Sequence, residues 1–120
     1  MKELNINVFS EDAQFCSALA IECNKYGFDL NFFEYKNIRK IIESGQLSVF
    51  IIDLKLNDCF DPYLIAKEIR SISDFPMFGI SDDKIIKNQV KVKECGFDLV
   101  FSKTILLRSI KEVIIHIKDQ

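Results

Sequence analysis

The chain has 120 residues and a mass of 13.9 kDa, with 48% hydrophobic and 28% charged residues, which fits one globular domain with a single core and excludes a disordered tail. Its formal net charge is −2, but residues 1–83 carry 8 Lys and Arg against 14 Asp and Glu, whereas residues 84–120 carry 8 against 4. No apolar run approaches the roughly 18 to 20 residues of a membrane span and no signal segment opens the chain, so we expect a soluble, cytoplasmic domain over residues 1–120.

Short apolar runs rich in Ile, Val and Phe alternate with amphipathic segments of helical length. Acidic or Gly residues mark several of the boundaries between them. In chain order, the expected elements are a strand at Leu4 to Phe9, a helix that follows Ser10-Glu11-Asp12 and ends at Gly27, a strand at Phe28 to Phe33, a helix at about 37–44, a strand at Ser48 to Leu54, a helix at about 62–72, a strand at Pro76 to Ile80, a helix at about 83–94, a strand at Phe97 to Phe101 and a helix from Ile105 onward.

A strict alternation of strand and helix, repeated five times, predicts a parallel sheet with helices on both faces. The third strand supports this, because it is apolar on both of its faces. The predicted class is therefore α/β, with three layers in a (βα)5 arrangement. Right-handed crossovers place the loops that follow the strands at one edge of such a sheet, where ligands bind.

These loops are acidic, with one lysine, and they exclude several kinds of site. Neither a Gly-rich phosphate loop nor a nucleophile elbow occurs, which disfavours dinucleotide, flavin, P-loop and hydrolase functions. No C-x-x-C pair occurs and His116 is the only histidine, which disfavours zinc and dithiol sites. The loops contain Ser10-Glu11-Asp12, Asp53, Ser81-Asp82-Asp83 and Ser102-Lys103-Thr104.

Carboxylates from neighbouring strand ends can hold a hard divalent cation, and a lysine beside them can neutralise a phosphoryl group. This combination suits phosphoryl transfer to an aspartate, which is a competent nucleophile once its charge is screened. Plainer roles stay open for each residue taken alone. Asp53 can be a loop cap, Ser81 a helix N-cap and Lys103 a surface charge.

Four short motifs occur in order along the chain. The strand from Val49 to Leu54 carries Asp53, the strand from Pro76 to Ser81 ends in a hydroxyl, and Cys95 to Asp98 leads into the strand that precedes Lys103. Together they resemble the receiver domain of two-component response regulators, over the whole chain. The resemblance implies a flavodoxin-like fold, with a five-stranded parallel sheet in the order 2-1-3-4-5.

The resemblance also implies roles for individual residues. Asp53 corresponds to the phospho-accepting aspartate, Ser81 to the hydroxyl residue that contacts the phosphoryl group, and Lys103 to the phosphate-binding lysine. By the same register, Glu11 corresponds to a metal-ligating acid. The implied cofactor is Mg²⁺, held by Glu11, Asp53 and the backbone carbonyl of Lys55.

One departure from the family concerns the metal. Ser10 stands where the family has its first acid, which leaves Glu11 and Asp53 as carboxylate ligands. Asp12, one residue further on, is a candidate substitute. We therefore expect weaker Mg²⁺ binding than is usual in the family.

Three further departures concern the response to phosphorylation. Asp82 stands where the family has a small residue, and it places a negative charge near a phosphoryl group. Thr104 replaces a cis proline; we expect a trans bond there, which leaves Lys103 free to point away from the site. Val100 stands where receivers carry a switching aromatic residue, and Phe101 should face the opposite side of its strand.

Two functions follow from these residues and the resemblance. The first is a phosphoprotein receiver in a two-component phosphorelay, with at most self-phosphorylation and autodephosphorylation as its own enzymatic chemistry. The second is a pseudo-receiver that binds proteins independently of phosphorylation. Implied partners are a sensor histidine kinase or phosphotransfer protein, a downstream protein and a second copy of the chain, but neither nucleic acid nor membrane.

The implied output surface combines the helix at 83–94, the strand at 97–101 and the last helix, with basic residues Lys84, Lys87, Lys91, Arg108 and Lys111.

Overall fold

The structure, a computed structural model, describes residues 4–32, 38–43, 47–55, 57–82 and 89–119. Within these residues, the strands are β1 (Leu4–Phe9), β2 (Asp29–Phe32), β3 (Leu47–Asp53), β4 (Met77–Ser81) and β5 (Leu99–Ser102). The helices are α1 (Ala13–Lys25), α2 (Ile38–Glu43), α3 (Pro62–Ile72), α4 (Gln89–Glu94) and α5 (Lys103–Lys118).

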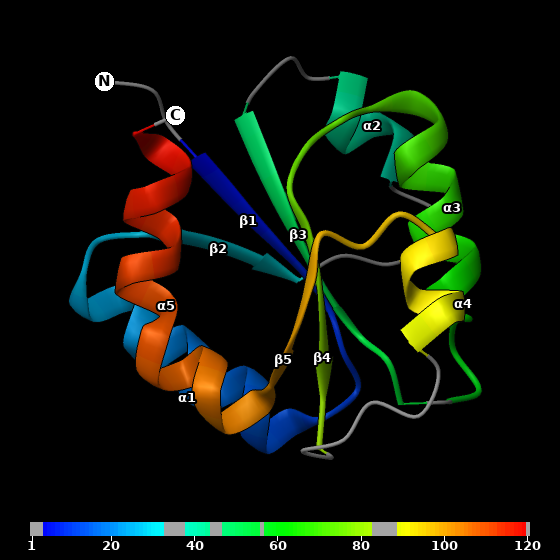
Figure 1. Ribbon diagram of the computed structural model, residues 1–120. Coiled ribbons are helices and arrows are strands. Elements are labelled where there is room, and N and C mark those ends of the chain that lie inside the picture. Colours follow the sequence, from blue (N-terminus) through cyan, green and yellow to red (C-terminus); the bar gives the residue numbers. More distant parts are fainter. Residues whose placement is uncertain (1–3, 33–37, 44–46, 56, 83–88, 120) are drawn as a thin grey trace.

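The strands form one parallel sheet in the order β2-β1-β3-β4-β5. Figure 1 shows α1 and α5 on one face of the sheet and α2, α3 and α4 on the other. The α/β class, the three layers and the strand order predicted from the sequence are thus confirmed. No helix in the described part of the chain is long and apolar enough to cross a membrane.

The central strand β3 separates two apolar cores. Val49 and Ile51 are buried in the core beneath α1 and α5, whereas Phe50 and Ile52 are buried in the core beneath α2 and α3. Burial on both faces explains why this strand is a continuous apolar run. Asp53, at its carboxyl end, is consequently carried to the edge of the sheet by a rigid, fully packed element.

Most strand boundaries differ from the prediction by one residue, and the boundaries around β5 differ by two. β5 begins at Leu99 rather than Phe97, and α5 begins at Lys103 rather than Ile105, because the Ser102 side chain accepts a hydrogen bond from the Ile105 amide and caps the helix. Lys103 therefore lies in the first turn of α5. A helix was predicted over 83–94, and α4 (Gln89–Glu94) accounts for the part that the structure describes. Residues 83–88, which include Lys84 and Lys87, lie outside the described residues.

Candidate functional site at the carboxyl edge of the sheet

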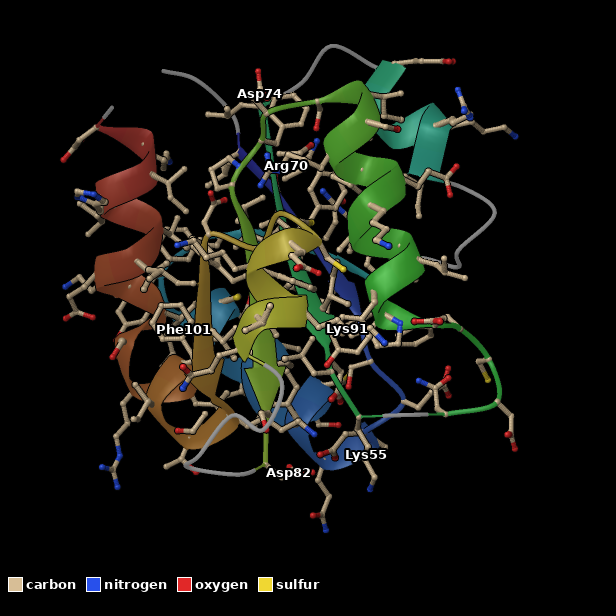
Figure 2. The ribbon with its side chains drawn as sticks, turned by 45° about the vertical axis from the view of Figure 1, so that its right-hand side comes forward. Lys55, Arg70, Asp74, Asp82, Lys91 and Phe101 are labelled. Atoms are coloured by element: carbon tan, nitrogen blue, oxygen red, sulfur yellow. The ribbon has the colours of Figure 1, made fainter. Side chains whose placement is uncertain are left out.

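The carboxyl ends of the parallel strands meet at one edge, as right-handed crossovers require. Asp53 closes β3, Ser81 closes β4, and Lys103 directly follows β5. Figure 2 shows Lys55 and Asp82 at this end of the molecule. The structure therefore brings the three predicted phosphoryl-site residues to the same edge.

Asp53 is 3% exposed, and hydrogen bonds hold both of its carboxylate oxygens. Oδ1 accepts a hydrogen bond from the backbone N–H of Lys55 at 3.0 Å. Oδ2 accepts one from the Ser10 hydroxyl at 2.7 Å and lies 3.0 Å from the Lys103 Nζ. A buried carboxylate needs such partners, because its charge is costly to remove from water. Asp53 is thus fixed in position as well as buried.

The Lys103 ammonium is surrounded by carboxylates. Its Nζ lies 3.0 Å from Asp12 Oδ2, 3.0 Å from Asp53 Oδ2 and 3.1 Å from Asp82 Oδ1. Although burial of Lys103 favours the neutral form, the hydrogen bonds to these carboxylates outweigh it and raise the pKa of Lys103 above its ordinary value. Lys103 is therefore a charged ammonium at neutral pH.

This geometry corrects one expectation. The described chain contains no cis peptide bond, as predicted for the Lys103–Thr104 bond, but Lys103 does not point away from Asp53. The reason is the early start of α5. Side chains in a first helical turn lean toward the helix N-terminus, which here faces the carboxyl edge of the sheet. A trans bond is thus compatible with the Asp53–Lys103 pair.

Asp12 and Glu11 have different environments. Asp12 caps α1, accepting a hydrogen bond from the Phe15 amide through Oδ1, while Oδ2 contacts Lys103. The bond from Phe15, then that from Lys103, holds the pKa of Asp12 below its ordinary value. Glu11 is exposed, and its carboxylate accepts a hydrogen bond from the Cys59 thiol, which raises the pKa of that thiol.

A hollow of about 360 Å³ lies beside Asp53. Two oxygen atoms at this hollow keep a lone pair that could bind a cation. Asp53 Oδ1 accepts one hydrogen bond, from the Lys55 amide, and the Lys55 carbonyl accepts one, from Asn57. These groups and Glu11 line the same hollow and are oxygen ligands of the kind that Mg²⁺ takes, since it binds through one or two carboxylates and keeps several waters. Within the described residues, no three His, Cys, Asp or Glu side chains are grouped to hold a metal ion. The residues lining the hollow are Glu11, Asp12, Ala13, Gln14, Asp53, Lys55 and Asn57.

The remaining predicted features lie on β4 and β5. Ser81 is half-buried and pairs in register with Ser102. Val100 packs into the core on the α3 side of the sheet, whereas Phe101 packs into the core on the α1 and α5 side, where its ring meets that of Phe78 edge to face. The prediction that Val100 and Phe101 face opposite sides of the sheet is confirmed, and Phe101 is labelled in Figure 2.

Sequence reasoning missed one contribution. Ser10 counted only as a missing acid, but its hydroxyl donates to Asp53 and its oxygen accepts from the Asp12 amide. The available signal was chemical: serine is short and carries both a donor and an acceptor, so it can bridge two groups at a strand end.

Comparison with solved structures shows the fold. The chain superimposes on a two-component response regulator from Clostridium difficile with a TM-score of 0.80 and 17% identity, covering 98% of each chain. A CheY-like response regulator receiver domain protein from Methanospirillum hungatei JF-1 gives 0.75 and 14%, again over 98% of each chain. A putative response regulator from Chloroflexus aurantiacus J-10-fl gives 0.76 and 13%, over 99% of this chain and 100% of the other.

No protein-family model matches the chain, and no curated protein sequence matches it. The chain therefore has the fold of response-regulator receiver domains, with a buried pair of Asp53 and Lys103 at the edge of the sheet where ligands bind in such folds.

Proposed function

We propose that residues 1–120 form a single receiver domain of a cytoplasmic two-component phosphorelay, in which Asp53 accepts a phosphoryl group from a histidine kinase or a phosphotransfer protein. The observation that carries this proposal is the buried Asp53–Lys103 pair, 3.0 Å apart, at the carboxyl edge of a receiver fold. An aspartate that only caps a loop can stay exposed to water and has no need of a buried lysine, so this pairing favours the chemical role of Asp53.

The reaction assigned to Asp53 is a simple displacement. A carboxylate oxygen forms a bond to the phosphorus of a phosphohistidine, the P–N bond breaks, and its electron pair stays on the imidazole nitrogen, which takes a proton from solvent. Lys103 neutralises the charge of the phosphoryl oxygens, and the Ser81 hydroxyl, at the end of β4, donates a hydrogen bond to them. The product is an aspartyl phosphate.

Mg²⁺ is the proposed cofactor, held by Glu11, Asp53 and the Lys55 carbonyl, with Asp12 as a further oxygen ligand. Bound there, a divalent cation would screen the charge of Asp53 from the phosphoryl oxygens. Each of these oxygen ligands already has a hydrogen-bond partner within the chain, among them Asp12 as a helix cap and the Lys55 carbonyl with Asn57, which supports a weak site.

Two observations favour the second candidate, a pseudo-receiver that binds proteins without being phosphorylated. In this structure, Lys103 is fully engaged by carboxylates, and Val100 provides no aromatic ring to respond to the site.

The output surface does not depend on which candidate is right. It combines α4, β5 and α5, on which Val90, Leu99, Lys93 and Arg108 are exposed. Lys91 of α4 lies over the Tyr63 ring of α3, and Lys111 of α5 lies over the Tyr26 ring at the end of α1. We propose that this surface binds an acidic protein partner or a second copy of the chain.

Phosphoryl transfer can be tested with phosphoramidate, a small donor that contains a P–N bond, in the presence of Mg²⁺. Intact-mass spectrometry should show a gain of one phosphoryl group, removable by hydroxylamine. The variant Asp53→Asn should not be labelled, whereas Asp58→Asn, which alters an exposed carboxylate in the loop after β3, should be labelled normally. Labelling of Asp53→Asn would exclude Asp53 as the acceptor, and an unlabelled wild-type chain would favour the pseudo-receiver.

A further inference from the structure

The hydrogen-bonding capacity of Lys103 is fully used. An ammonium has three N–H donors, and the Lys103 Nζ lies within 3.1 Å of three carboxylates, those of Asp12, Asp53 and Asp82. Transfer of a phosphoryl group to Asp53 converts one of these three carboxylates into an acyl phosphate. The Asp12 and Asp82 carboxylates then still compete with the phosphoryl oxygens for the Lys103 ammonium.

The three carboxylates are not held equally. Asp53 is also fixed by Ser10 and Lys55, and its side chain is only 4% exposed. Asp12 is also fixed as the cap of α1, with 32% exposure. Asp82 is 55% exposed, and the described hydrogen bonds and ion pairs give it Lys103 alone as a partner. Since water can replace Lys103 most easily at an exposed carboxylate, Asp82 is the carboxylate that leaves at the smallest cost.

We propose that Asp82 is an internal competitor for Lys103, and that a phosphoryl group on Asp53 takes its place on the ammonium. This inference rests on the proposed function of Asp53. It makes Asp82 a positioning residue, which sets how strongly Lys103 can bind an oxyanion. Removing its charge also removes a like charge from the neighbourhood of the phosphoryl oxygens, which acts in the same direction.

The test uses beryllofluoride, a non-covalent mimic of the phosphoryl group, with Mg²⁺ present and amide NMR shifts as the readout. The dissociation constant is measured for the wild-type chain, Asp82→Asn, Asp82→Glu and the control Asp58→Asn. We expect Asp82→Asn to bind about tenfold more tightly than wild type, because one partly screened opposing charge is removed. Asp82→Glu should stay near wild type, and so should Asp58→Asn, whose carboxylate is exposed at the same edge but is not paired with Lys103.

The outcomes separate this inference from the proposed function. Tighter beryllofluoride binding by Asp82→Asn than by wild type supports the inference. If beryllofluoride shifts the amide resonances of Asp82→Asn but not those of wild type, the result supports the inference and contradicts phosphorylation of the native chain. Equal affinities for wild type and Asp82→Asn overturn the inference and leave the function standing. Absence of binding in both overturns both. An equal gain in Asp58→Asn overturns the inference, because it would trace the effect to net charge.

Discussion

Ser10 sets the charge around Asp53. A hydroxyl at this position donates a hydrogen bond to Asp53 Oδ2 at 2.7 Å, whereas a carboxylate would repel it. The buried aspartate is therefore stabilised by Ser10 and Lys103. Serine in place of an acid lowers the affinity for a divalent cation, because that affinity rises with the number of charged ligands.

The substitution Ser10→Asp should reverse this balance. A further carboxylate beside Asp53 should tighten Mg²⁺ binding by about tenfold, because it adds one full charge to the ligand set. Mg²⁺ titration followed by amide NMR shifts measures the change. Ser10→Asn, which introduces a side chain of the same length as aspartate without the charge, is the control, and equal affinities for the two variants would contradict the explanation.

At the scale of elements, α3 is tied to the edge of the sheet opposite the site. The Arg70 guanidinium donates to the Gly96 carbonyl at 2.7 and 3.1 Å and to the Phe75 carbonyl at 3.1 Å, and it pairs with Asp98 at 3.2 Å. Asp98 in turn accepts a hydrogen bond from the Met77 amide. One arginine thus joins α3 to the segments that precede β4 and β5, and Figure 2 shows it far from Lys55 and Asp82.

The substitution Arg70→Met keeps the aliphatic stem of this side chain but removes its donors. We expect the free energy of unfolding to fall by about 2 kcal/mol, since hydrogen bonds from a charged donor are lost and the Gly96 carbonyl loses its partner. Arg39→Met is the matched control: Arg39 makes an exposed ion pair with Glu68 at 3.7 Å, and its loss should cost about 0.5 kcal/mol or less. Urea unfolding curves measure both, and equal losses would contradict the assigned role.

At the scale of the whole molecule, the site couples folding to pH in two directions. The pKa of Lys103 is raised in the folded state, so its contribution to stability is present below its unfolded pKa and is lost as pH rises through the folded value. The pKa of Asp12 is lowered, so its contribution is present above its unfolded pKa and is lost as pH falls through the folded value.

Stability should therefore show a broad maximum between about pH 5 and pH 10. The alkaline fall should be smaller in Lys103→Met, because the group that titrates there is gone. Lys67→Met, which alters an exposed lysine on α3, should keep the wild-type alkaline fall. Urea unfolding at a series of pH values tests this expectation. An unchanged alkaline fall in Lys103→Met would assign the effect to other groups.

Much of the fold follows from local pattern. The double-sided apolar run that ends at Asp53 indicates a central strand, and Gly27 and Gly96, with φ of +70° and +94°, lie just after helices where left-handed backbone is required. The start of α5 was harder to predict, because Ser102 can cap a helix or extend a strand equally well. Only its hydrogen bond with the Ile105 amide distinguishes the two.

The sequence by itself determined the α/β class, the alternation of elements and the gathering of Asp53, Ser81 and Lys103 at one edge, because these follow from periodicity and from the geometry of parallel sheets. Only the tertiary structure decided how the charges pair. Asp12 and Lys103 are 91 positions apart in the chain and 3.0 Å apart in space. Such a contact depends on where α1 and α5 pack against the sheet, and the strength of a charge interaction depends on that separation and its burial.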